Sequence, residues 1–188
     1  MTPAPSPVVG LFVGGAARRM GGAPKGLLTA PGGETIVERW RTLCGTVGLR
    51  CFLVGEADAY ARLGIERIAD ARPGAGPLGG LVGLLRAQPT APVVAVACDM
   101  PFVTEALLRR LAFSTSTAAA LAPWRDDLFE PLFARYDPTR VLPLAERQLA
   151  GDDLSMQRLL RGAGAERLPL SSDEWPLLAD WDEPSDVA

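Results

Sequence analysis

The stretch VVGLFVGGAARRMGGAPKGLL, residues 8–28, joins a short apolar run to a loop rich in glycine and basic residues. Gly14 and Gly15 follow the apolar run directly, and a chain that turns sharply there presents its backbone amides at the end of a strand. Arg19 and Lys25 add positive charge to the same loop. Amides and cations together suit a polyphosphate, so the stretch predicts a phosphate-binding loop after a buried strand.

Lys25 is the only lysine of the chain, since every other basic residue is arginine. An ammonium is a compact point charge and a guanidinium is a planar fork, so the two bind phosphate differently. A chain that keeps one ammonium, and keeps it in this loop, indicates a role for it at the phosphates. The loop is not a Walker A motif, because Pro24 precedes Lys25 and Gly26 stands where Ser or Thr is needed.

Composition narrows the class of protein. The 188 residues are 48% hydrophobic, which is enough for the core of one domain, 1–188.

Residues 1–7 are expected to be a flexible lead. They lack the features of a signal peptide, and no long apolar stretch predicts a membrane anchor, so we expect a cytoplasmic protein. The net charge of -3 argues against nucleic-acid binding, and the absence of histidine excludes His-based triads and zinc sites.

Apolar runs alternate with segments of helix length, which predicts an α/β fold. We expect strands at 8–14, 49–55, 65–69, 92–98 and 118–123, and helices at 34–46, 57–63, 78–87, 104–111, 139–150 and 154–162. Most of these strands are apolar without alternation, as in sheets covered on both faces. The expected architecture is a mostly parallel Rossmann-like sheet flanked by helices, with a small C-terminal hairpin and helical extension. Ligands of such sheets bind beyond the carboxyl ends of the strands.

The loop ADARPGAGPLGGL, residues 69–81, holds a second glycine-rich turn, with Asp70 at the end of an expected strand. The spacing G-x-G-x-x-G is matched by Gly74, Gly76 and Gly79. Asp99 follows the last of these glycines by 20 residues, so the pattern imitates a dinucleotide fingerprint, and an NAD-binding protein is one alternative. Pro77 removes an amide from the turn that should wrap a pyrophosphate, which weighs against that alternative.

Asp99 follows the apolar run PVVAVAC, residues 92–98. A carboxylate beside a buried strand costs free energy unless it is paired or coordinates a cation, and Mg²⁺ on nucleotide phosphates is the usual oxygen-ligand solution. The alternative is structural: Asp99 caps the helix that is expected from Thr104, or closes an Asx turn before Pro101. These residues alone leave both interpretations open.

The loops together bring phosphate-binding amides, one lysine and one aspartate to the same edge of the sheet. Nucleotidyl transfer needs these groups, because they neutralise a triphosphate, align the attacking oxygen and stabilise the departing pyrophosphate. An attacking phosphate is already ionised near neutral pH, so no histidine is required. We expect a Mg²⁺-dependent nucleotidyltransferase with Arg19, Lys25 and Asp99 as catalytic residues. Residues 8–123 are the expected nucleotide-binding part, and residues 124–188 the acceptor-side extension.

FVGGAARRMGGAPKGLL, residues 12–28, resembles the N-terminal signature of the MobA-like nucleotidyltransferases, with molybdenum cofactor guanylyltransferases as the most similar members. The similarity continues through Asp70 with GPLGGL, ACDMPF at 97–102, EPLFARY at 130–136 and DWDEPSD at 180–186. The resemblance implies a nucleotide-diphospho-sugar transferase-like fold. It also implies transfer of GMP from GTP to the terminal phosphate of molybdopterin carrying molybdenum, which yields the guanine dinucleotide cofactor and pyrophosphate.

The same resemblance assigns residues to the substrates. It implies a nucleotide site built from Phe12, Val13, Gly14, Gly15, Lys25, Asp70, Gly76, Pro77, Leu78 and Asp99. Asp99 would hold Mg²⁺, and Asp182 would lie on the metal or acceptor side. Trp124 and Trp181 are the candidates for contact with the flat pterin of the acceptor.

Several positions depart from the family pattern. Pro24 stands where guanylyltransferases often have Asp, and Glu183 replaces the common Thr before Pro184. The pair Gly14-Gly15 resembles the guanylyl branch, whereas the cytidylyl branch more often has Ala-Gly there. Molybdopterin cytidylyl transfer is therefore the nearest alternative, followed by a sugar-phosphate nucleotidyltransferase and by a non-catalytic nucleotide-binding protein. The family also implies transient contact with a molybdenum-insertion enzyme or a recipient apoenzyme.

Overall fold

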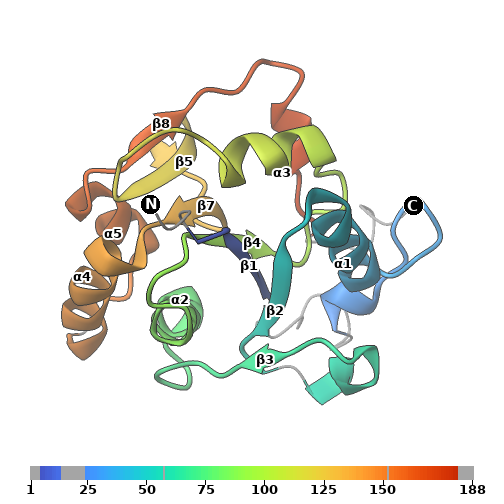
Figure 1. The fold of residues 1–188 in the computed structure, drawn as a ribbon, viewed down its shortest axis with the longest axis horizontal. Coiled ribbons are helices and arrows are strands. Elements are labelled where there is room, and N and C mark those ends of the chain that lie inside the picture. Colours follow the sequence, from blue (N-terminus) through green and yellow to red (C-terminus); the bar gives the residue numbers. More distant parts are fainter. Residues whose placement is uncertain (1–4, 14–23, 57, 152, 182–188) are drawn as a thin grey trace.

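The computed structural model describes residues 5–13, 24–56, 58–151 and 153–181. In these residues one β-sheet lies between two layers of helices (Figure 1). The strands are β1 (Val8–Phe12), β2 (Arg50–Val54), β3 (Arg67–Ile68), β4 (Val93–Ala97), β5 (Ala120–Arg125), β6 (Leu128–Phe129), β7 (Phe133–Tyr136) and β8 (Glu166–Leu168). The helices are α1 (Ile36–Val47), α2 (Gly76–Ala87), α3 (Glu105–Ala112), α4 (Pro138–Ala150) and α5 (Met156–Gly162), with 3₁₀ turns η2 (Lys25–Leu27), η3 (Asp58–Leu63) and η4 (Trp175–Leu178).

The sheet has the strand order β3-β2-β1-β4-β7-β5-β6, with β8 beside β5. β1 pairs in parallel with both β2 and β4, and β2 pairs in parallel with β3. β7 is antiparallel to β4 and to β5, so the five strands expected from the sequence all run in one direction. The predicted α/β class is confirmed, and "mostly parallel" is an approximation because β6 and β7 run the other way.

Each face of the sheet packs against its own layer of helices. Val9 and Leu11 of β1 belong to the cluster of buried side chains that includes α1 and α3. Val8 and Phe12 belong to the opposite cluster, which includes α2, α4 and α5. This is the alternation of side chains along a strand. Because both faces of β1 are covered, all five of its residues are buried, as its unbroken apolar run predicts.

Local signals in the sequence set the helix ends. Thr35 caps α1 in a reciprocal capping box with Glu38, and Gly48 ends that helix at φ 80°. Thr104 caps α3 by accepting the Leu107 amide, which confirms the helix start expected there. The expected helix over 57–63 is instead the 3₁₀ turn η3.

The C-terminal half joins the same sheet and the same helix layer as α2. Residues 124–127, the polar stretch WRDD, form the tight β5–β6 hairpin of the expected C-terminal extension, and Asp126 and Asp127 both have positive φ, as a two-residue type I′ loop requires. β7, from the segment EPLFARY, inserts between β4 and β5 in the middle of the sheet. Pro7, in the stretch expected to be a flexible lead, is buried.

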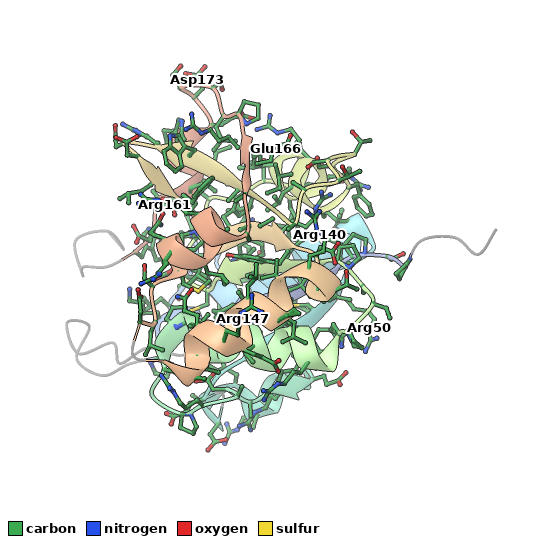
Figure 2. All side chains as sticks on the ribbon, turned by 90° about the vertical axis from the view of Figure 1, so that its left-hand side faces the viewer. Arg50, Arg140, Arg147, Arg161, Glu166 and Asp173 are labelled. Atoms are coloured by element: carbon green, nitrogen blue, oxygen red, sulfur yellow. The ribbon has the colours of Figure 1, made fainter. Side chains whose placement is uncertain are left out.

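Figure 2 shows the layer of α4 and α5 from outside, with the exposed Arg140 and Arg147 on α4 and Arg161 on α5. A shallow hollow of about 400 Å³ on this layer is lined by Arg147, Asp153 and Arg158, among others, and holds none of the predicted site residues. No helix in the described ranges is long and apolar enough to cross a membrane.

Two helical glycines provide a matched test of this packing. A Cβ on Gly83 of α2 would lie 2.2 Å from the carbonyl oxygen of Ala69, whereas a Cβ on Gly45 of α1 would have nothing within 4 Å. Gly83→Ala is expected to lower the free energy of unfolding by about 1–3 kcal/mol, because the backbone of the 69–71 loop must move. Gly45→Ala is expected to raise it by up to about 1 kcal/mol through helix propensity. Urea denaturation of both variants checks the pair; equal gains in stability would contradict the close approach of α2.

Candidate active site

Lys25 and Asp99, the two charged residues that the sequence singles out, lie in contact. The Lys25 Nζ is 2.9 Å from Asp99 Oδ2, across 74 residues of chain. Their side chains are only 19% and 17% exposed, so this ion pair is much less solvated than a surface pair. Asp99 follows β4 and Lys25 begins η2, so both stand beyond the carboxyl ends of the parallel strands, where ligands of such sheets bind.

The ion pair stands on a close-packed base. The Gly26 amide donates a hydrogen bond of 3.2 Å to the buried phenol oxygen of Tyr60. A Cβ on Gly26 would lie 2.5 Å from Val37 and 3.0 Å from Tyr60, which explains why the residue after Lys25 is glycine. Burial, and next the charge of Asp99, raise the pKa of the Cys98 thiol to about 12, so this sulfur is an inert packing group beneath the pair.

Arg39 of α1 fixes the loop that follows Asp99. Its Nε donates to the carbonyl of Pro101 at 2.5 Å, and its Nη2 donates to the carbonyl of Val103 at 2.9 Å. The same loop is held from the C-terminal side, since the Trp181 amide donates to the Asp99 carbonyl at 2.9 Å. The helix-capping interpretation of Asp99 is not what the structure has, because Thr104 caps α3 and the Asp99 carboxylate pairs with Lys25.

Asp70 lies at the same edge of the sheet, after β3. Partial burial raises the pKa of its carboxyl group, and the nearby charge of Glu56, which follows β2, raises it further. A Cβ on Gly80 would lie 2.8 Å from the Phe12 ring and 3.2 Å from Asp70 Oδ1, so the lack of a side chain there lets α2 approach both residues. Phe12 and Asp70, two predicted nucleotide-binding residues, therefore meet the same glycine.

The turn into α2 supplies backbone groups. Gly76 and Pro77 are exposed in the first helical turn, and the preceding Ala75 makes no side-chain cap. Leu78 is fully buried, backbone included, so of these three residues Gly76 and Pro77 are the ones that a ligand can reach. Gly14, Gly15, Arg19 and Asp182, which the sequence also assigns to the site, lie outside the described residues.

The structure changes the view of the aromatic residues. Trp181 is 5% exposed and contacts the Phe102 ring edge-to-face, with centroids 6.0 Å apart, so Trp181 is not an open stacking surface. Trp124 lies between Phe129, at a ring distance of 4.5 Å, and the Arg167 guanidinium, 4.3 Å from its centroid. Trp181 is therefore closed to a pterin, whereas Trp124 is half-buried and has the Arg167 guanidinium over its ring.

Two acidic residues near the site, Glu130 and Asp180, were not predicted as site residues from the sequence. Burial, and then the charge of Asp180, raise the pKa of the Glu130 carboxyl group, so the two side chains are neighbours. Asp180 adjoins Trp181, whose amide binds the Asp99 carbonyl. Glu130 is the first residue of EPLFARY and Asp180 the first of DWDEPSD, so the signal was present in those motifs. No group of three or more His, Cys, Asp or Glu side chains in the described part of the chain is arranged to hold a metal ion.

Comparison with known proteins decides the family. A model described as the MobA-like NTP transferase domain matches residues 10–168, which covers all of the described elements from β1 to β8 apart from the first residues of β1. The chain belongs to the MobA-like NTP transferases. This confirms the resemblance inferred from the sequence motifs.

Relatives of this MobA-like NTP transferase match it over most of their length. The molybdenum cofactor guanylyltransferase of Pseudomonas putida is 30% identical over 171 residues, which cover 87% of each chain. A probable molybdenum cofactor guanylyltransferase of Opitutus terrae is 30% identical over 185 residues, covering 94% of this chain and 90% of the relative. The crystal structure of molybdopterin-guanine dinucleotide biosynthesis protein A from Archaeoglobus fulgidus superposes with a TM-score of 0.78 at 26% identity, covering 95% of this chain and 94% of the other.

The charge state of Asp70 gives a test of this site. The folded protein holds the Asp70 proton to a higher pH than the unfolded chain does, so the folded state loses stability as pH rises above the ordinary Asp range. Asp70→Asn is therefore expected to raise the free energy of unfolding at pH 8 and to change it little at pH 4.

Asp153 provides a control variant for which the opposite change in the free energy of unfolding is expected. The Ser155 amide, followed by Arg158, lowers the pKa of the Asp153 carboxyl group, so that its charge stabilises the folded state at neutral pH. Asp153→Asn should lower the free energy of unfolding at pH 8. Denaturation at the two pH values measures both variants, and an Asp70→Asn protein that is less stable than the wild type at pH 8 would contradict this account.

Proposed function

We propose that this MobA-like NTP transferase transfers GMP from GTP to the terminal phosphate of molybdopterin carrying molybdenum, forming the guanine dinucleotide cofactor and pyrophosphate. The half-buried ion pair of Lys25 and Asp99 carries the proposal, because it joins one phosphate-binding cation and one carboxylate at the carboxyl edge of the sheet. The names of the relatives from Pseudomonas putida and Opitutus terrae support guanylyl transfer in particular.

In the proposed reaction an oxygen of the acceptor phosphate attacks the α-phosphorus of GTP. One phosphorus–oxygen bond forms to the acceptor, and the bond between the α-phosphorus and the bridging oxygen to the β-phosphate breaks, so that pyrophosphate leaves with its electron pair. No proton transfer is needed at the attacking oxygen, which fits a chain without histidine. Catalysis then rests on positioning and on neutralising charge.

The Lys25 ammonium serves the triphosphate in this proposal. It is placed by the η2 turn, whose Gly26 amide is anchored on Tyr60. The pairing with Asp99 positions the ammonium at the site, and on nucleotide binding its hydrogen bonds would pass to phosphate oxygens. A fixed cation in a weakly solvated site stabilises developing charge more strongly than a mobile surface cation does.

Asp99 fits a Mg²⁺ ion that arrives with the nucleotide. Mg²⁺ is commonly held by one or two carboxylates together with waters and substrate phosphates, so a single protein carboxylate is a suitable donor set. Bound there, the ion would neutralise phosphate charge and polarise the α-phosphate. Asp70 and the backbone at Gly76 are the proposed partners of the guanine nucleotide, because they lie at the same edge around α2.

CTP, ATP and NAD are the alternative ligands that the binding experiment compares with GTP. A synthase of 4-diphosphocytidyl-2C-methyl-D-erythritol from Anaerococcus prevotii has a TM-score of 0.71 at 12% identity, covering 98% of this chain and 96% of the other. A likeness at that identity supports a common fold alone. Thermal stability should be measured with GTP, CTP, ATP and NAD, each with and without Mg²⁺.

The first functional prediction concerns nucleotide binding. GTP with Mg²⁺ at 100 times its dissociation constant is expected to stabilise the protein by about 2.7 kcal/mol. Asp99→Asn should remove the Mg²⁺-dependent part of this shift, whereas Asp153→Asn, which alters an exposed ion pair with Arg158, should keep it. A shift with CTP alone would move the proposal to cytidylyl transfer, and a shift with NAD in the absence of Mg²⁺ would overturn it.

The second functional prediction concerns the chemistry of the cation. Lys25→Arg keeps the charge but replaces a compact ammonium by a planar fork in a space that is only 19% exposed, so pyrophosphate release should fall by at least tenfold. Arg109→Lys makes the reverse exchange in an exposed ion pair with Glu105 and should keep wild-type turnover. Release is measured with GTP, Mg²⁺ and molybdopterin; equal rates for Lys25→Arg and the wild type would contradict the assigned role.

A further inference from the structure

Phe102 combines exposure with a fixed backbone. The residue is 37% exposed, although a single exposed apolar residue is common and has no meaning by itself. The carbonyls of the residues on either side, Pro101 and Val103, both accept hydrogen bonds from Arg39. Pro101 and Val103 are themselves buried, so the Phe102 ring is the part of this segment that faces outward.

The ring is supported from behind. Trp181 contacts Phe102 at an interplanar angle of 78°, and Trp181 is tied to the Asp99 carbonyl by its own amide. An edge-to-face pair of this kind restricts the ring, and the residue stays 37% exposed despite it. Phe102 is therefore an apolar surface held by contacts with α1 and with the C-terminal segment.

The position of Phe102 relates it to the acceptor and not to the nucleotide. Asp70 follows β3 and Asp99 follows β4, with β2 and β1 between these strands in the sheet. A nucleotide whose base lies near Asp70 and whose phosphates lie near Asp99 would span this interval. Phe102 lies on the other side of Asp99, because it contacts Trp181, and the adjoining Asp180 is a neighbour of Glu130, which precedes β7, the strand beside β4 on the side away from β1.

We propose that Phe102 is the surface against which the flat ring system of the acceptor packs, and that Arg39 is a positioning residue that holds this surface in place. The inference rests on the proposed function, since the acceptor is taken to be a phosphate attached to a fused planar heterocycle. The phosphate meets the Lys25–Asp99 region while the rings lie on Phe102. Phe102 thus takes the role that the sequence analysis assigned to Trp124 and Trp181.

Steady-state kinetics with separate variation of GTP and molybdopterin tests the proposal. Stacking on an aromatic side chain is lost in Phe102→Ala, so the KM for molybdopterin is expected to rise on the order of tenfold. The KM for GTP should stay within about twofold of the wild type, and Phe102→Tyr should restore the acceptor KM. Phe113→Ala is the matched control, because Phe113 is 46% exposed at the far end of α3 and should behave as the wild type.

Arg39 variants test the positioning role. Arg39→Ala should raise the acceptor KM in the same way as Phe102→Ala, with kcat at saturating substrates changed less, and Arg39→Lys should recover only part of the loss because it cannot donate to both carbonyls as a fork. The double variant Arg39→Ala with Phe102→Ala should be no worse for the acceptor KM than Phe102→Ala alone. Additive losses would overturn the role of Arg39.

Equal acceptor KM values for Phe102→Ala and Phe113→Ala would overturn the proposal while leaving guanylyl transfer intact. A parallel rise in the GTP KM would also overturn it, because it would place Phe102 in the nucleotide site. Should the wild type transfer no nucleotide, the quenching of fluorescence of a pterin monophosphate on binding to the free protein decides: weaker binding by Phe102→Ala than by Phe113→Ala supports the surface without the reaction. A wild type that neither transfers nor quenches overturns both proposals.

Discussion

Burial of β1 on both faces is the constraint from which the arrangement of the site follows. A strand covered by α1 on one side and by α2 on the other must carry apolar residues throughout and must leave room where a helix comes close. Gly10 provides that room, since a Cβ there would lie 2.1 Å from the Leu84 side chain. With β2 and β4 paired in parallel on its two sides, β1 directs several loops to one edge, where the charged residues gather.

In the proposed function, the charged groups at that edge receive a substrate that already carries negative charge together with a metal ion. Lys25 and Asp99 neutralise each other in a half-buried environment, so neither is an isolated charge in a weakly solvated place. A triphosphate with its cation offers each of them a new partner of opposite charge. The nucleotide and the metal would therefore replace one satisfied pair by two, which links their binding.

Much of the fold was predictable from local sequence because apolar runs alternate clearly with segments of helix length, and because capping and turn residues mark where the elements end. The five expected strands are present and run in one direction, and the Thr104 cap and the polar WRDD turn formed as their residue types require. A C-terminal hairpin was expected, but the position of β7 between β4 and β5 was not, since its short apolar segment carries no sign of which neighbours it will pair with. That choice depends on contacts across the sheet, between segments remote in sequence.

The sequence by itself determined the class of fold, the family and the two residues of the central ion pair. It did so because Lys25 is the chain's only lysine and stands in a glycine-rich loop, and because Asp99 places a carboxylate beside an apolar run, where it needs a partner. Only the tertiary structure decided that Trp181 is buried behind Phe102, because exposure is set by neighbours far apart in the chain. It also showed that Arg39, an ordinary helical arginine in sequence, anchors the loop after Asp99, since its partners lie 62 and 64 residues away.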